Sequence, residues 1–212
     1  MPVIRRVVLV GNAPLCRSIA GLVDTADHVV RFNKVRGHGG TSGSRTDELY
    51  LINHGGQMAE WLATDELAEH RALRTATTVV LPVPMLPGHL SPRRARALER
   101  ATGIETAPDR INHLDEARAR FARSGHAIVA VGVAEYRGAQ RALYELLPAA
   151  DERYPSTGFI AVHRTLARAR PDERIELVGF AFEGWRGHSW NAERRWVTAR
   201  EREGRLAIRA VD

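Results

Sequence analysis

The sequence is poor in features that mark several well-known classes of protein. It holds one cysteine, Cys16, among 212 residues, so it forms no internal disulfide and is not a disulfide-built secreted module. Its longest weakly polar run, residues 127–134, is far shorter than the roughly 20 residues of a membrane-spanning helix. The apolar stretch near its start is too short for a secretory signal peptide, which needs about 7–15 apolar residues. We therefore expect a cytoplasmic protein with no integral membrane segment.

Two motifs of nucleotide and metal chemistry are also missing. The dinucleotide fingerprint G-x-G-x-x-G is absent, because Ala13 stands where the second glycine would follow Gly11. There is no phosphate-binding P-loop either. No D-x-D pair follows an expected strand, so nothing supplies the paired carboxylates that hold a divalent cation. We expect neither a metal nor a bound cofactor.

Lysine is almost absent, since Lys34 is the single lysine among 31 basic residues and the formal net charge of +6 comes from arginine. A basic chain invites a nucleic-acid partner. The arginines are nevertheless scattered through helical stretches and interleaved with acidic residues, as is typical of solvated helix faces. An anionic small ligand such as a nucleotide suits a basic protein equally well. We expect no nucleic-acid partner.

The residues that are present alternate between strand and helix patterns. A short β-branched run predicts a strand at residues 5–10, and further short runs predict strands at residues 28–32, 49–53, 77–82, 127–131, 174–180 and 206–208. Helical spacing predicts helices at residues 15–23, 58–69, 91–101, 114–124, 140–147, 158–169 and 193–203. This alternation predicts an α/β fold, a three-layer α/β/α arrangement around a mostly parallel sheet. Neither a linker nor a repeat divides the chain, so we expect a single domain over residues 1–212.

Ligands of such a sheet bind beyond the carboxyl ends of its strands. Gly11 and Asn12 follow the first strand, where glycine admits a ligand and the amide offers a donor and an acceptor. Arg31 and Asn33 share one face of the end of the second strand, and a loop at residues 39–47, rich in Gly, Ser and Thr, follows them. The plainer interpretations are an ordinary strand-to-helix turn and a flexible surface connection.

Two further segments lie at the same edge. Ser156-Thr157-Gly158 opens a helix, where hydroxyls and backbone N–H groups either cap the helix or hold a phosphate. His188 stands in a glycine-rich loop just before a helix, as a candidate general base or a structural surface histidine. We expect the positive end of the following helix dipole to keep its imidazole neutral.

Taken in order, these segments resemble the eukaryotic-type sialyltransferases, glycosyltransferase family 29. The family's long motif is matched by Val10-Gly11-Asn12, by residues 24–33 and by Gly43-Ser44-Arg45-Thr46. Its short motif is similar to residues 155–158, which are followed after a helix by Leu177-Val178-Gly179-Phe180. Its very short motif, H-x-x-x-x-E, is matched by His188 and Glu193. The resemblance covers residues 7–53 and 154–208.

The resemblance implies a Rossmann-like sheet of a GT-A-like variant and a specific chemistry. It implies metal-independent, inverting transfer of a sugar from a nucleotide-activated donor, in this family CMP-sialic acid, to a hydroxyl of a glycan acceptor. Of the matched residues, His188 and Glu193 would be catalytic. The nucleotide would bind Gly11, Asn12, Arg31, Asn33, Ser156, Thr157, Gly158, Gly179 and Phe180. The family's separate histidine motif is not distinct here, so His188 corresponds to either of two family histidines.

The chain also resembles small bacterial proteins named for genes beside urease operons, with the same G-N-x-P start and W-x-G-H-x-W-x-x-E-R ending. That name reports the position of a gene and no chemistry. Two other functions stay open on the sequence. A non-catalytic nucleotide- or sugar-binding accessory protein would keep the scaffold and lose turnover. A nucleotide-cofactor oxidoreductase would need a phosphate fingerprint that the sequence lacks.

Overall fold

The computed structural model describes residues 4–64, 66–148 and 153–210. Within these ranges a 7-stranded sheet has the order β5-β4-β3-β2-β1-β6-β7. Every neighbouring pair of strands is parallel, so the α/β prediction is confirmed and the sheet is parallel throughout. The strands are β1 (Arg5–Val10), β2 (His28–Phe32), β3 (Glu48–Tyr50), β4 (Thr78–Leu81), β5 (Ala127–Ala130), β6 (Glu173–Val178) and β7 (Ala207–Arg209).

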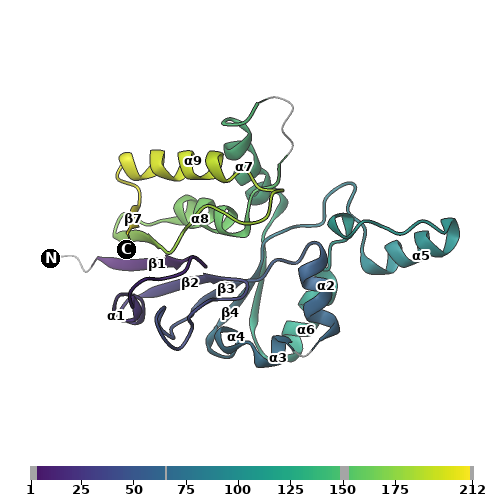
Figure 1. Ribbon diagram of the computed structural model, residues 1–212, viewed down its shortest axis with the longest axis horizontal. Coiled ribbons are helices and arrows are strands. Elements are labelled where there is room, and N and C mark those ends of the chain that lie inside the picture. Colours follow the sequence, from purple (N-terminus) through teal and green to yellow (C-terminus); the bar gives the residue numbers. More distant parts are fainter. Residues whose placement is uncertain (1–3, 65, 149–152, 211–212) are drawn as a thin grey trace.

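Helices cover both faces of the sheet and complete three layers (Figure 1). One face carries α7 (Val133–Tyr144), α8 (Thr157–Arg168) and α9 (Trp190–Arg202). The other face carries α1 (Ala20–Asp24), α2 (Gly56–Ala63), α3 (Glu66–Glu69), α4 (Arg71–Thr75) and α6 (Leu114–Arg123). The helix α5 (Pro92–Thr102) projects from the body, and a short 3-10 turn, η1 (Pro108–Arg110), follows it. No helix in the described ranges is long and apolar enough to cross a membrane.

The two-residue period of a strand distributes β1 between two cores. Val7 and Leu9 pack beneath α7, α8 and α9, whereas Val8 and Val10 pack against Val23 of α1. All of them are buried, and burying an aliphatic side chain fully stabilises the fold by about 1.5–3 kcal/mol. A strand with two apolar faces belongs in the interior of the sheet, where β1 lies between β2 and β6.

Several helix boundaries differ from those expected from the sequence. The first helix begins at Ala20 rather than Leu15, because the preceding backbone bends and the Ile19 N–H donates to the Thr41 carbonyl instead. The helix expected over residues 58–69 is divided, since α2 ends at Ala63 and Thr64 is extended. Residue 65 lies outside the described residues.

The helix α7 begins seven residues before the expected Gln140. Its start is marked by Gly132, whose N–H donates to the Glu135 carboxylate at 3.3 Å. This side-chain cap holds a start that apolar spacing does not reveal. The other predicted helices lie within a few residues of their predicted positions, whereas α4 was not predicted from the sequence.

The strand order changes direction between β1 and β6, and there the loops after both strands come into backbone contact. The Gly11 N–H donates to the Val178 carbonyl at 2.8 Å, and the Ala13 N–H donates to the Gly179 carbonyl at 3.0 Å. A Cβ on Gly11 would lie 2.2 Å from the Gly179 oxygen. Gly179 itself has a φ of +67°, which favours glycine. Crevices at such switch points are where open α/β sheets bind ligands.

Candidate functional site

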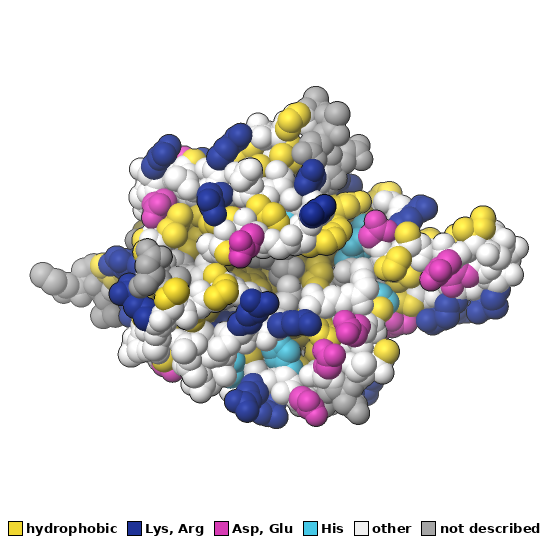
Figure 2. Space-filling view, viewed as in Figure 1, with side chains coloured by type: hydrophobic (Ala, Val, Ile, Leu, Met, Phe, Trp, Pro, Cys, Tyr) yellow, Lys and Arg dark blue, Asp and Glu magenta, His cyan; other side chains and the backbone are white. Residues whose placement is uncertain are grey.

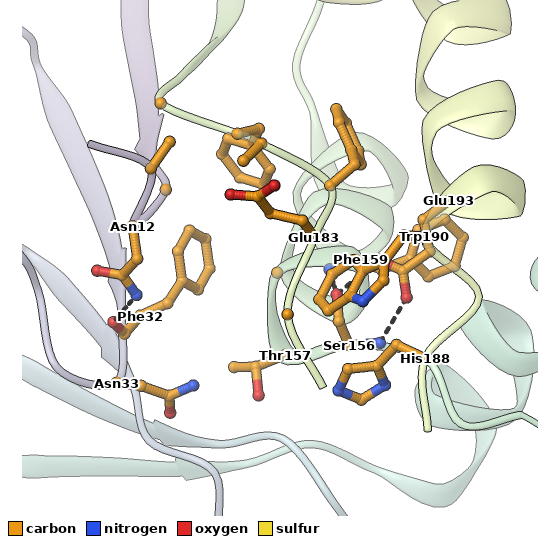
Figure 3. Close-up of a pocket in the computed structure, with 18 of the residues that line it drawn as sticks. Asn12, Phe32, Asn33, Ser156, Thr157, Phe159, Glu183, His188, Trp190 and Glu193 are labelled. Carbon is orange, nitrogen blue, oxygen red and sulfur yellow. Dashed lines mark hydrogen bonds between the residues drawn. The ribbon is translucent and has the colours of Figure 1, made fainter. Parts of the chain in front are cut away.

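A cavity of about 440 Å³ opens at this switch point. It is lined by residues from segments that lie far apart in the sequence, as expected for the carboxyl edge of a parallel sheet. Figure 3 shows Asn12, Phe32 and Asn33 along one wall, facing Ser156, Thr157, His188 and Trp190 on the other. Of the residues expected at the site, those that line this cavity are Gly11, Asn12, Asn33, Ser156, Thr157, Gly158, Gly179, Phe180, His188 and Glu193.

The two asparagines of the first wall also brace the loops that carry them. The Asn12 amide donates to the Phe32 carbonyl at 2.8 Å and accepts from the Arg36 N–H at 3.0 Å. The Asn33 amide oxygen accepts from the Ile52 N–H at 2.9 Å. Asn33 also has a φ of +49°, a conformation in which asparagine is enriched among non-glycine residues. The Nδ2 group of Asn33 has no partner among the described residues, so it is the amide group available to a ligand.

Ser156 and Glu193 form one buried unit. The Ser156 Oγ accepts from the Phe159 N–H at 3.0 Å, which caps α8. The Glu193 carboxylate accepts from the Ser156 N–H at 2.8 Å and from the Ser156 hydroxyl at 2.7 Å. Burial raises the pKa of Glu193 to about 7, against the lowering effect of these hydrogen bonds. Glu193 therefore positions the start of α8.

The first turn of α8 presents unpaired backbone donors to the cavity. The N–H groups of Thr157 and Gly158 have no acceptor among the described residues, as the first positions of a helix require. Gly158 packs close to the Phe180 ring, because a Cβ there would lie 3.3 Å from it. Lys34 and Arg36 line the same cavity. These charges and the helix N-terminus together favour an anionic ligand.

Arg31, which the resemblance placed in the nucleotide site, does not line this cavity. It is fully buried, and its guanidinium donates to the Arg45 carbonyl, the Ser42 carbonyl and hydroxyl, and the Gly43 carbonyl. Burial lowers its pKa to about 10. From the opposite side, the Asp24 carboxylate accepts from the N–H groups of Ser44 and Arg45. Arg31 thus holds a loop that the sequence suggested was flexible.

His188 is held in one tautomer by a backbone contact. Its Nδ1 lies 2.8 Å from the Tyr154 carbonyl oxygen. Because a carbonyl only accepts, Nδ1 carries the proton and Nε2 keeps its lone pair. The ring stands nearly perpendicular to those of Trp185 and Trp190, with centroids 4.9 and 5.0 Å away. Burial lowers the pKa of His188, which favours the neutral imidazole.

A second cavity of about 580 Å³ adjoins the first. Seven lining residues are common to both cavities, and they form the boundary: Asn33, Gln57, Thr157, Glu183, Gly184, His188 and Trp190. His188, whose Nε2 keeps a free lone pair, therefore lines both cavities. Figure 2 shows basic side chains and histidines around the hollowed centre of this face.

Several lining residues escaped the sequence analysis. His54 follows β3 and precedes two glycines, so the strand-end rule used for the other segments would have found it. His89 lies in the loop between β4 and α5, and Asp109 lies in the short turn η1, where no periodicity marks them. Within the described ranges, no three His, Cys, Asp or Glu side chains are grouped to hold a metal ion.

The fold has counterparts among solved structures. A mammalian sialyltransferase matches with a TM-score of 0.53 and 18% identity, over 97% of this chain and 68% of that one. The sialyltransferase CstII from Campylobacter jejuni, solved with cytidine-5'-monophosphate, gives 0.55 at 9% identity over 98% and 79%. An α-2,3-sialyltransferase from Campylobacter jejuni gives 0.55 at 12% over 98% and 75%. At such identities the likeness establishes a shared sialyltransferase-like α/β fold.

None of the protein-family models matches the chain. A curated relative does, the urease operon 23 kDa accessory protein of Rhizobium meliloti (strain 1021). It is 30% identical over 209 residues, which covers 95% of this chain and 91% of that protein. The match therefore includes the middle of the chain as well as the segments that line the first cavity. The chain therefore belongs to the family of the urease operon 23 kDa accessory protein.

Proposed function

We propose that the protein transfers a sugar from a nucleotide-activated donor, CMP-sialic acid by its resemblance, to a hydroxyl of a glycan acceptor. The observation that carries this proposal is the position of His188, a neutral imidazole of fixed tautomer that lines both adjoining cavities. A transferase needs its base at the boundary between two substrates. The shared fold gives support, because the solved relatives include CstII with cytidine-5'-monophosphate and with CMP-3FNeuAc.

In this proposal the nucleotide occupies the first cavity. The unpaired N–H groups of Thr157 and Gly158 receive the phosphate, and Lys34 and Arg36 add positive charge nearby. Asn33 offers its free Nδ2 group to the nucleotide, and Phe180 contributes an aromatic wall. Donors placed in advance at the leaving phosphate stabilise the negative charge that grows there during transfer.

The acceptor occupies the second cavity and reacts across the boundary. Its hydroxyl oxygen attacks the anomeric carbon while the bond from that carbon to the phosphate oxygen breaks. The nucleoside monophosphate leaves with the bonding electrons, and the hydroxyl proton passes to Nε2 of His188. Attack from the side opposite the leaving group inverts the anomeric carbon. Such general base catalysis typically contributes a factor of about 10²–10⁴.

Two ligand measurements test the proposal. CMP should raise the melting temperature of the protein more than UMP or GMP at equal concentration, since a ligand at 100 times its Kd adds about 2.7 kcal/mol of apparent stability. CMP-sialic acid should be hydrolysed slowly without any acceptor. Binding of CMP without hydrolysis or transfer would instead favour a non-catalytic nucleotide-binding protein, the alternative to which the accessory name of its relative points. Absence of any nucleotide binding would refute the proposal.

We also propose that the transfer needs no metal ion. The phosphate contacts proposed above come from backbone N–H groups and from basic side chains. Activity and CMP affinity should therefore be unchanged after dialysis against EDTA. A loss of activity that magnesium or manganese restores would contradict this part of the mechanism.

A further inference from the structure

The two adjoining cavities differ in charge. Lys34 and Arg36 line the first cavity. Among the described residues that line the second there is no lysine or arginine, although the whole chain carries a net charge of +6. Two exposed carboxylates line the second cavity: Asp109, which does not line the first, and Glu183, which lines both. The second cavity is thus a locally acidic space in a basic protein.

The histidines of the second cavity do not restore positive charge. Burial lowers the pKa of His54 to about 4 and also lowers those of His89 and His188. The His54 and His89 rings lie 4.4 Å apart at 32°, a close contact between two uncharged rings. The Nε2 atom of His54 is buried and has no hydrogen-bond partner in the part of the chain that the structure describes. At neutral pH these imidazoles offer polar nitrogen atoms and no charge.

The other large side chains of this cavity are aromatic: Tyr136, Tyr154, Trp185 and Trp190. Aromatic ring faces attract cations by about 0.5–2 kcal/mol and also pack against the apolar faces of sugars. Two arginines lie near the cavity without lining it. Arg137 donates to the Gln140 side chain at 2.6 Å, and Arg153 donates to the Arg186 carbonyl at 2.6 Å. Carboxylates together with aromatic rings suit an ammonium group.

We propose that the second cavity takes an amine-bearing sugar, whose protonated amino group lies against the carboxylates of Asp109 and Glu183. The proposal rests on the transferase function above and names the class of its acceptor. A neutral sugar meets the same aromatic rings without the charge attraction. An anionic sugar meets two carboxylates and no cation among the described residues that line the cavity, so it is the least favoured of the three.

Three matched probes test this charge preference by direct binding. The methyl glycosides of glucosamine, glucose and glucuronic acid are titrated into the protein, with and without CMP, and followed by calorimetry. The glucosamine glycoside should bind at least about fivefold more tightly than the glucose glycoside, the gain expected from partly exposed charge pairs. The glucuronic acid glycoside should bind most weakly.

Two substitutions and a control assign the preference to the carboxylates. The double variant Asp109→Asn, Glu183→Gln should bind the glucosamine and glucose glycosides equally. Glu105→Gln, which changes an exposed carboxylate that does not line the cavity, should keep the wild-type order. An unchanged melting temperature establishes that each variant folds.

Several outcomes would overturn the proposal. They are equal binding of the amine and neutral glycosides by the wild type, preference for the glucuronic acid glycoside, and binding of none of the three. A double variant that keeps the preference would also overturn it. Failure of CMP to bind refutes the nucleotide part of the proposed function. The ranking of the glycosides, measured without CMP, is scored independently of that result.

Discussion

His188 shows how a single backbone contact gives a side chain a chemical role. A histidine with both nitrogens free would exchange tautomers, and a protonated one would have no lone pair to offer. The Tyr154 carbonyl removes the first possibility and burial removes the second. Gly187 has a part in this arrangement, because a Cβ there would lie 2.1 Å from the Trp185 ring. A side chain at residue 187 would displace one of the two rings that flank His188.

Replacement of His188 should separate binding from turnover. We expect His188→Ala to keep its nucleotide affinity and to lose transfer activity by at least about a hundredfold, because a general base is removed while the phosphate contacts remain. The Kd for CMP and the turnover number are measured side by side. Intact turnover would make His188 a structural loop residue. A collapse of affinity would place it on the phosphate side and the base elsewhere.

Glu193 is buried where the first turn of α9 meets the start of α8, and its raised pKa makes the free energy of unfolding depend on pH. A carboxyl whose pKa rises from 4.5 to about 7 on folding keeps in the native state a proton that the unfolded chain has already lost. Its contribution to stability is therefore greatest below pH 4.5 and declines as the pH rises toward 7. The histidines whose pKa values are lowered, including His54 and His188, act in the opposite direction below pH 6.5.

Glu193→Gln should isolate that contribution. The free energy of unfolding of the wild type minus that of the variant should fall by a few kcal/mol, on the order of 3, between pH 4.5 and 7. Urea unfolding at a series of pH values gives both profiles, and the histidine effects cancel in the difference. A difference that stays constant with pH would show that Glu193 is ionised throughout.

Among the elements, the loops after β1 and β6 approach each other so closely that a side chain does not fit between them. Each loop has a glycine at the point of closest approach. Gly11 is required because a Cβ would collide with the Gly179 carbonyl, and Gly179 because its φ is positive. The backbone of one strand end thereby forms part of the wall for the other. The cavity owes its shape at this point to the main chain rather than to side chains.

A methyl group at Gly11 should push the two loops apart. We expect Gly11→Ala to reduce the free energy of unfolding by about 3 kcal/mol, because its Cβ would lie 2.2 Å from a backbone oxygen that cannot rotate away. Gly21→Ala is the matched control, since no atom lies within 4 Å of the added Cβ. Alanine in a helix should leave stability equal or slightly higher there. Equal losses in both variants would contradict the steric argument.

The elements that the sequence predicted best are those whose signal is local. Residues 5–10 and 28–32 contain runs of valine bounded by glycine or polar residues, and both strands are predicted to the residue. The start of α7 was missed because it depends on the reach of Glu135 to the Gly132 N–H. The late start of the first predicted helix was missed because Ile19 bonds to Thr41, which is distant in the sequence.

For the whole molecule, the strand-end rule alone placed most of the candidate site in one cavity. Arg31 is the exception. Alternation along a strand predicts the face on which a side chain lies, but it does not predict that the loop at residues 42–45 already covers that face. The second cavity could not be predicted from the sequence for a different reason. His54, His89 and Asp109 meet only after α5 and η1 have turned the chain back over the sheet edge, and no spacing in the sequence encodes that return.

The position of β1 between β2 and β6 also sets the order in which its two edges can pair during synthesis. Its edge toward β2 can pair once residue 32 has been made, whereas its other edge waits for β6, residues 173–178. At about 5–20 residues per second, a ribosome leaves that edge open for on the order of ten to thirty seconds. An open strand edge is a template for pairing between chains. Since Gly179 and His188 arrive with or after β6, no ligand of the cavity protects the nascent chain during this interval.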